Sequence, residues 1–202
     1  LSEWRHGGIP ADFLPLQSGV GNVANAVLGS LGSEPQLPAL SMYTEVIQNS
    51  VIELMQQGRI RFATGSSLTL SDDHLNLVYD NLDFSIPICS YAHRKSPIIL
   101  LVRRLGVIAI NTALEADIFG NVNSTHVLGT NDERIGGSAD FARNAYLSIY
   151  HAINGQKRLI SSIVTNVSHV DSSEHSVRVL VTEQGVADLR GKSPIERARC
   201  II

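Results

Sequence analysis

The chain has 202 residues, of which 44% are hydrophobic and 17% are charged, and its net charge is -3. This composition is that of an ordinary folded protein that can bury a sizeable core. The small negative charge gives no electrostatic reason to expect nucleic acid or an anionic membrane as a partner. Two cysteines are too few for a disulfide framework and suit a reducing compartment, so we expect a cytoplasmic protein, or a mitochondrial one in a eukaryote.

No apolar run approaches the length needed to span a bilayer. The longest, residues 97–102, has the length of a strand and is followed by Arg103 and Arg104. The sequence begins with Leu1 and stops within a helical pattern. We therefore expect it to be a piece of a longer protein.

The first patterned segment predicts a strand, a glycine turn and a helix. Residues 14–18 form the strand candidate and residues 19–22 the turn. Apolar residues then recur at helical spacing over residues 23–28. Glycine and proline breaks in residues 29–38 indicate a loop.

The next segment centres on Glu45. A short, mostly apolar run over residues 40–43 leads into Thr44 and Glu45, and Gly58 is a plausible helix stop. Between them, apolar residues recur at helical spacing at Val46, Ile47, Val51, Ile52, Leu54 and Met55. We therefore expect Glu45 where a strand passes into a helix, at the edge of an α/β sheet where ligands bind. The alternative is a carboxylate that only stabilises the first helical turn.

The remaining pattern alternates strands and helices. We expect strands at residues 60–64, 86–91, 105–111, 160–164 and 177–182. We expect helices at residues 71–79 and 139–150, a hairpin turn at residues 117–123, and a final helix that opens with a capping box at Ser193. This alternation predicts an α/β fold with an open mixed sheet flanked by helices.

Two local patterns suggest other chemistries. Residues 19–24 match G-x-G-x-x-A, and Glu45 follows at the distance of a ribose-binding acid, as in a dinucleotide-binding fold. The segment before this turn contains Pro15 and polar residues, however, whereas a first Rossmann strand is usually an apolar run. A tight turn without any ligand is the other interpretation.

The second pattern is a cluster of metal-binding residue types within residues 168–175. His169, Asp171, Glu174 and His175 lie there, in a segment rich in serine between two predicted strands. Their spacing is not H-E-x-x-H, and ligands on such a turn need not converge. We favour a structural or surface role and expect no metal. A Ser-His-Asp triad is formally available, but the chain has no G-x-S-x-G elbow.

Five segments together carry a more specific signal. They are residues 16–22, 43–48, 111–126, 136–145 and 181–191. In this order and spacing they resemble the acetyl-CoA hydrolase/transferase family, most of all its succinyl-CoA:acetate CoA-transferase branch. The resemblance covers nearly the whole chain. It implies that residues 1–202 are a CoA-transferase C-terminal domain, without the N-terminal domain and the last helices.

The resemblance also implies a reaction. In this family CoA moves between an acyl-CoA, such as acetyl- or succinyl-CoA, and a small carboxylate such as acetate. The nucleophile maps to Glu45, which would carry CoA as a glutamyl thioester, and hydrolysis results if water intercepts an acyl intermediate. Coenzyme A is then a co-substrate, no cofactor is tightly bound, and the full-length protein is expected to be a homodimer. A homologue that binds CoA without turnover is the alternative.

Family site residues map onto specific positions. The backbone N–H groups of Val20 and Gly137 are expected to form an oxyanion hole, and Glu183 to orient the nucleophile and the small carboxylate. Lys157 is an approximate match to a lysine that neutralises a CoA phosphate. Contacts to CoA are expected at Gln17, Ser18, Gly19, Val20, Leu114 and Gly137. Glu115 and Asp117 belong to the same motif and are expected to support the site.

Overall fold

The computed structural model describes residues 2–81, 88–90, 98–127, 130–131, 136–152 and 161–202. The chain divides into two compact units, Leu1–Ile108 and Ala109–Ile202. We call them the N-terminal and the C-terminal unit and describe each by itself. Within the described ranges, no helix is long and apolar enough to cross a bilayer.

The N-terminal unit is built on parallel strands. Its sheet has the order β1-β2-β4-β6, made of β1 (Leu16–Ser18), β2 (Leu40–Tyr43), β4 (Ile60–Gly65) and β6 (Ile88–Ser90). Each neighbouring pair is parallel, and the register places Leu16 beside Met42 and Met42 beside Ala63. The carboxyl ends of these strands therefore lie along one edge, where α/β proteins bind their ligands.

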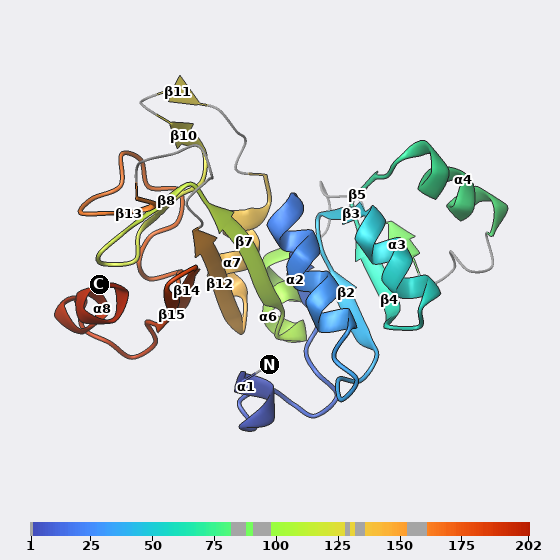
Figure 1. The fold of residues 1–202 in the computed structure, drawn as a ribbon, viewed down its shortest axis with the longest axis horizontal. Coiled ribbons are helices and arrows are strands. Elements are labelled where there is room, and N and C mark those ends of the chain that lie inside the picture. Colours follow the sequence, from blue (N-terminus) through green and yellow to red (C-terminus); the bar gives the residue numbers. More distant parts are fainter. Residues whose placement is uncertain (1, 82–87, 91–97, 128–129, 132–135, 153–160) are drawn as a thin grey trace. The chain divides into compact units, whose positions relative to one another are not determined.

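Helices α2 (Asn22–Gly32) and α3 (Asn49–Gln56) cover one face of this sheet (Figure 1). Helix α2 packs against β1, α3 packs against β4, and the two helices contact each other. The side chains between the layers are apolar and almost fully buried: Leu16, Ala24, Leu28, Leu40, Met42, Val51, Ile52, Ile60 and Ala63. The other elements of this unit are α1 (Ser2–Arg5), β3 (Val46–Gln48), β5 (Ser67–Thr69), α4 (Asp72–Asp80) and α6 (Ile98–Leu105).

The C-terminal unit has a mixed sheet of the order β15-β14-β12-β7. Its strands are β7 (Ile108–Ala113, which begins at the unit boundary), β12 (Leu147–Ala152), β14 (Val179–Thr182) and β15 (Gly185–Asp188). Strands β12 and β14 are parallel, whereas β14 and β15 form an antiparallel hairpin. With strands flanked by helices in both units, the α/β prediction with a mixed sheet is confirmed.

A smaller sheet of the order β13-β8-β9 completes this unit, from β8 (Glu115–Asp117), β9 (Val122–Asn123) and β13 (Ile163–Val164). The pair β8–β9 is antiparallel, as the predicted hairpin turn at residues 117–123 requires. Strands β10 (His126–Val127) and β11 (Thr130–Asn131) form a second short hairpin. Helices α7 (Ser138–Asn144) and α8 (Pro194–Ile201) pack against β12 and β15.

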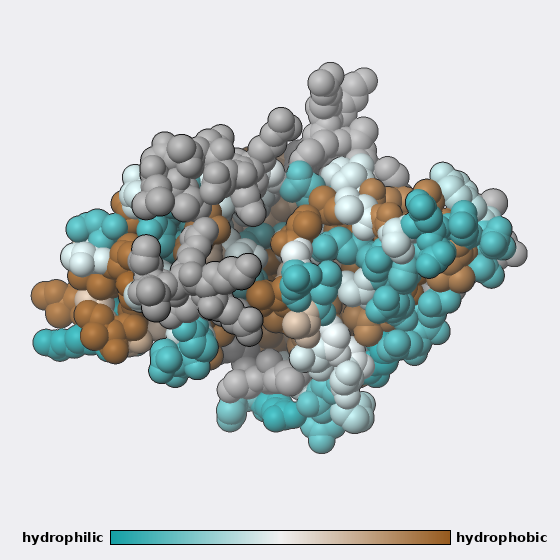
Figure 2. Space-filling view, turned by 45° about the horizontal axis from the view of Figure 1, so that its top comes forward, coloured by the Kyte–Doolittle hydropathy of each residue, from teal (hydrophilic) through white to brown (hydrophobic). Residues whose placement is uncertain are grey.

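Helix α8 begins as the sequence predicts. The Ser193 amide and hydroxyl both donate to the Glu196 carboxylate, at 2.8 and 2.7 Å, and the capping box is complete. Apolar side chains reach the surface here: Val186 of β15, Ile195 of α8 and Ile202 directly after α8 are exposed. Brown surface is visible at the edge of Figure 2 where α8 lies in Figure 1.

The helix predicted for residues 139–150 is wrong in its second half. Helix α7 ends at Asn144, Ala145 has extended backbone, and residues 147–152 form strand β12. The register of β12 on β14 places Tyr150 beside Leu180 and buries both side chains. Pairing with a distant strand therefore decided the conformation of a segment whose local pattern also fits a helix.

The apolar run at residues 97–102 is not a strand. Residues 98–105 form helix α6, with Val102 buried and Arg103 and Arg104 exposed. A run of six apolar residues fits either structure, and its periodicity alone does not choose. Gly106, at a φ of 67°, follows the helix, so strand β7 begins at Ile108, three residues later than predicted. In the same way α2 continues to Gly32, into the segment predicted as a loop.

Candidate active site

The glycine turn joins β1 to α2 at the ligand-binding edge of the N-terminal unit. Gly21 precedes the first residue of α2 and has a φ of 125°, which residues with a side chain rarely adopt. The Val20 side chain is 59% exposed, and within the described residues its amide donates to no protein acceptor. The backbone N–H of Val20 in this turn is therefore available to donate a hydrogen bond.

Glu45 lies at the same edge, two residues beyond the end of β2, and is half-buried. The expected passage from strand directly into helix is wrong at this point. Val46 and Ile47 belong to strand β3, which pairs in parallel with β5, and α3 starts only at Asn49. Val and Ile favour extended backbone, and here the neighbouring strand pairs with them. The charge of Glu45 therefore does not serve the first turn of α3.

Two sets of hydrogen bonds fix the backbone around Glu45. The hydroxyl of Thr44, which is fully buried, donates to the Ser18 carbonyl at 3.1 Å and so links this segment to β1. The Glu45 carbonyl accepts hydrogen bonds from the Ser66 amide and hydroxyl, both at 2.9 Å, and from the Ser67 amide at 3.1 Å. Glu45 is thus held through its main chain, between β1 and the turn that follows β4.

The side chain of Gln48 bridges Glu45's segment and the glycine turn. Its amide nitrogen donates to the Gly19 carbonyl at 3.2 Å, and its amide oxygen accepts from the Gly21 N–H at 3.4 Å. Sequence reasoning gave Gln48 no role. The signal that could have found it is its position at the end of segment 43–48, one of the five that carry the family resemblance.

Gly65 is the second residue that the sequence reasoning did not single out. A Cβ atom at this position would lie 2.9 Å from Ile47 Cγ1 and 3.3 Å from the Glu45 carbonyl oxygen. The absence of a side chain therefore lets the end of β4 approach the Glu45 segment closely.

The predicted CoA-contact residues of this unit differ in exposure. Gln17 and Ser18 are buried in β1, Gly19 is half-buried and Val20 is exposed. The structure therefore brings this segment and Glu45 together through the bonds from Thr44 and Gln48. The turn at Gly19 and Val20 is more accessible than the two buried side chains, and contact of these residues with CoA stays a prediction.

The other predicted residues belong to the C-terminal unit. Leu114 directly follows β7 and is half-buried, Gly137 is buried at the start of α7, and Glu183 is exposed between β14 and β15. Lys157 lies outside the described residues. Their placement around Glu45 stays a prediction.

Glu115 and Asp117 have carboxylates that are engaged within the protein. Asp117 Oδ1 accepts from the amides of Phe119, Gly120 and Asn121 at 2.9–3.0 Å, which shapes the β8–β9 turn. Burial raises the pKa of Glu115, but hydrogen bonds from Ser168 and Asn123 outweigh it and leave this pKa below its ordinary value. Both carboxylates thus hold local structure, and the supporting role expected for them at the site stays a prediction.

The metal-binding residue types of segment 168–175 do not all lie together in the structure. His175 has 86% of its side chain exposed, whereas His169 Nε2 lies 3.3 Å from Asp171 Oδ1. The third member of the group is His126, which the sequence reasoning did not include. No local spacing could reveal it, because His126 comes from a strand more than forty residues earlier.

Comparison with known proteins identifies the family. The model of the acetyl-CoA hydrolase/transferase C-terminal domain matches residues 76–202. The chain is 54% identical over 205 residues to propanoyl-CoA:succinate CoA transferase of Escherichia coli, covering 100% of this chain and 42% of that protein. It is 51% identical over 205 residues to succinyl-CoA:acetate CoA-transferase of Clostridium kluyveri, covering 99% and 38%. The chain thus spans about two fifths of the length of the curated relatives it matches.

A solved structure shows the same fold. RipA from Yersinia pestis superimposes with a TM-score of 0.80 at 26% sequence identity, over 98% of this chain and 47% of that one. The G-x-G-x-x-A turn therefore lies in a CoA-transferase-like framework, and the resemblance noted from the sequence is confirmed. The chain belongs to the acetyl-CoA hydrolase/transferase family.

Proposed function

We propose that this chain is the part of a CoA-transferase that carries its nucleophile. The enzyme would move CoA from an acyl-CoA, acetyl- or succinyl-CoA, to a small carboxylate such as acetate. One observation carries the proposal: Glu45 and the Val20 amide, which has no acceptor among the described residues, lie at the carboxyl ends of adjacent parallel strands. The Thr44 and Gln48 hydrogen bonds link these two ends. The names of the relatives, which pair propanoyl- or succinyl-CoA with succinate or acetate, support short acyl groups as substrates.

The proposed reaction is a sequence of acyl transfers on Glu45. The carboxylate attacks the thioester carbonyl, the C–S bond breaks, and an acyl-glutamyl anhydride and CoA thiolate form. The thiolate attacks Cδ, the carbonyl carbon of the Glu45 side chain. This attack releases the first carboxylate and leaves a glutamyl-CoA thioester. The acceptor carboxylate then reverses both steps and regenerates Glu45 without a net proton change. Such attack depends on proximity, because a carboxylate is a weak nucleophile in water.

Each step creates a negatively charged oxygen that needs a hydrogen-bond donor. The Val20 amide is fixed in the glycine turn and offers such a donor without reorganisation during the reaction. We assign the second donor to Gly137, and the orientation of Glu45 and the acceptor to Glu183. Gly19, Leu114 and Lys157 would contact CoA, which is a co-substrate.

The covalent intermediate gives the direct test. The full-length protein is incubated with acetyl- or succinyl-CoA without acceptor, digested, and its Glu45 peptide weighed by mass spectrometry. We expect a peptide that carries CoA, which disappears in Glu45→Gln and on addition of acetate. A protein that binds CoA but forms no adduct and transfers none would be a homologue without turnover, and would overturn the proposal.

The role of the Val20 amide can be tested separately. Val20→Pro removes the N–H, whereas Val20→Ala shortens the side chain and keeps it. We expect kcat to fall about 100- to 1000-fold for the proline variant and little for the alanine variant. Equal activity in both variants would remove Val20 from the mechanism and leave the test on Glu45 unaffected.

A further inference from the structure

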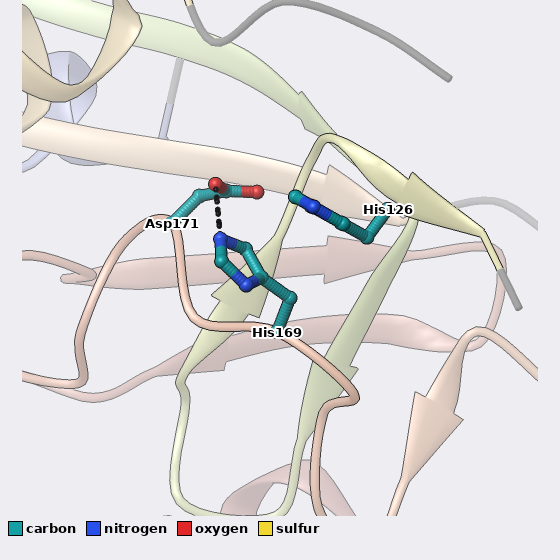
Figure 3. A group of neighbouring side chains, drawn as sticks. All are labelled: His126, His169 and Asp171. Atoms are coloured by element: carbon teal, nitrogen blue, oxygen red, sulfur yellow. Dashed lines mark ion pairs between the residues drawn. The ribbon is translucent and has the colours of Figure 1, made fainter. Parts of the chain in front are cut away.

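A cluster of two imidazoles and one carboxylate lies in the C-terminal unit. His126 comes from β10, whereas His169 and Asp171 come from the loop between β13 and β14, and the three side chains point toward one another (Figure 3). One possible ligand atom from each residue lies within 4.8 Å of the others. We propose that His126, His169 and Asp171 bind a divalent transition-metal ion, with Zn²⁺ as the best fit.

The carboxylate is the first reason. Only 7% of the Asp171 side chain is exposed, and a buried carboxylate needs compensating hydrogen bonds or a cation. Its Oδ2 atom accepts from the Ser124 amide and the Thr125 hydroxyl, both at 2.7 Å. Within the described residues its one ion-pair partner is His169, at 3.3 Å from Oδ1. Oδ2 is thus engaged in structure, whereas Oδ1 faces His169.

The tautomer of His126 is the second reason. The Thr125 hydroxyl has a single proton, which it donates to Asp171, because an ionised carboxylate only accepts. The same hydroxyl oxygen lies 2.8 Å from His126 Nδ1, which must then donate to it. In the neutral ring this leaves the lone pair on Nε2. Metal-binding histidines are usually oriented in this way, by a hydrogen bond from the other ring nitrogen.

The distances suit a small tetrahedral ion. Zn²⁺ bound at about 2.0–2.2 Å by nitrogen and oxygen ligands has neighbouring ligand atoms about 3.3–3.6 Å apart. The separation of His169 Nε2 and Asp171 Oδ1, 3.3 Å, already has this value. The imidazole rings of His126 and His169 are tilted by 34° and their centroids lie 3.9 Å apart. His169 is half-exposed, which leaves a position for water as the fourth ligand.

The backbone that carries the ligands is held in place without the ion. Asn123, which is fully buried, accepts hydrogen bonds from the amides of Thr125 and His126 through its side-chain oxygen, at 3.1 and 2.9 Å. Next to His169, the Ser168 amide and hydroxyl donate to Glu115 at 2.7 and 2.6 Å. Both ligand-bearing segments are thereby attached to the β8–β9 hairpin, so little ordering remains to be done on binding.

The test uses the full-length protein after removal of metal with a chelator. Co²⁺ is the probe, because a tetrahedral site gives it intense visible absorption, and Zn²⁺ is then added in competition. We expect one equivalent to bind and the unfolding temperature to rise with metal concentration. His126→Gln, His169→Gln and Asp171→Asn should each weaken binding by at least about 100-fold.

His175→Gln is the matched control, since this imidazole lies in the same segment but is exposed and outside the group. We expect it to bind Co²⁺ like the wild type. Should a ligand variant fail to fold, Thr125→Val addresses the same question, because it removes only the bond that orients His126 and should weaken binding about 10- to 100-fold. Absence of stoichiometric binding, or equal losses in His175→Gln and His169→Gln, would overturn the proposal and leave two neighbouring imidazoles, one of which contacts Asp171.

Discussion

Hydrogen bonds act on different groups of the acidic residues in two regions of the molecule. In the N-terminal unit, the hydrogen bonds from Ser66 and Ser67 that fix Glu45 act on its carbonyl oxygen. In the C-terminal unit, the bonds that fix Glu115 and Asp117 act on the carboxylates themselves. A carboxylate that already accepts three or more hydrogen bonds is stabilised as an anion and has few lone pairs left to attack a substrate. The comparison therefore identifies Glu115 and Asp117 as residues that hold the hairpin, and the proposed role of Glu45 is tested against them.

The largest effect should come from Glu45→Gln. The amide keeps the size of the side chain and the main-chain hydrogen bonds but cannot form the thioester. We expect CoA transfer by the full-length protein to fall by a factor on the order of 10⁴ or more. The unfolding temperature should stay near that of the wild type. A variant that loses activity only in proportion to folded protein would place Glu45 with Glu115 and Asp117 as a structural residue.

Asp117→Ala, unlike Glu45→Gln, should lower the stability of the folded protein. It removes the carboxylate oxygen that accepts from three buried or half-buried amides. The Phe119 and Asn121 amides lose this acceptor, whereas the Gly120 amide keeps its hydrogen bond to the Asp117 carbonyl. We expect unfolding free energy to fall by about 2–4 kcal/mol, measured by urea denaturation. Asp12→Ala, at an exposed loop position, is the control and should change it by less than about 0.5 kcal/mol. A loss no larger than the control's would show that the hairpin does not depend on this carboxylate.

Thr44→Val tests the link between the two strand ends of the N-terminal unit. The change keeps the shape of the side chain but leaves the Ser18 carbonyl without its 3.1 Å hydrogen bond. We expect a loss of about 1–2 kcal/mol in unfolding free energy, together with a reduced kcat, because Val20 is less well held beside Glu45. Thr69→Val, at an exposed position in β5, should leave both unchanged. An unchanged kcat in Thr44→Val would mean that the strand ends hold their positions without this bond.

The smallest effect concerns pH and Glu115. Its folded-state pKa lies below the ordinary value of 4.5, so its carboxylate stabilises the folded state above that pH. This contribution is lost as pH falls through the folded-state pKa. The stability difference between wild type and Glu115→Gln should therefore be largest near about pH 7 and shrink toward about pH 3. Glu174→Gln, whose carboxylate lies 3.8 Å from the exposed His175, should show a smaller change. A difference that grew toward acid would contradict the sign of the shift.

Local chemistry made part of the fold predictable. The capping box at Ser193, the glycine turn before α2 and the β8–β9 turn each depend on residues close together in sequence, and all three formed as predicted. Predictions were less reliable for segments whose pattern fits both a helix and a strand. Residues 98–105 form a helix, although an apolar run of this length also fits a strand. Residues 147–152 form a strand because they pair with β14, which no local window contains.

The residues of the candidate sites likewise fall into those that local motifs predicted and those that only the structure brings together. Glu45 and Val20 were predicted from motif segments, because the resemblance to the family assigns roles to particular residues at particular spacings. Gln48 and Gly65 act across the fold: Gln48 bridges to a turn 27 residues away, and Gly65 accommodates Ile47. The joining of His126 to His169 and Asp171 likewise depends on how β10 and the 168–171 loop are attached to one hairpin.

By itself, the sequence determined the α/β class, the family and the identity of the proposed nucleophile, since these follow from periodicity and from residues in ordered segments. Only the tertiary structure decided that Glu45 is held through its backbone while Glu115 and Asp117 are held through their carboxylates. It also decided that an imidazole from a distant hairpin meets the His169–Asp171 pair. The physical reason is that hydrogen bonds and packing across strands join atoms whose separation along the chain leaves no trace in any short pattern.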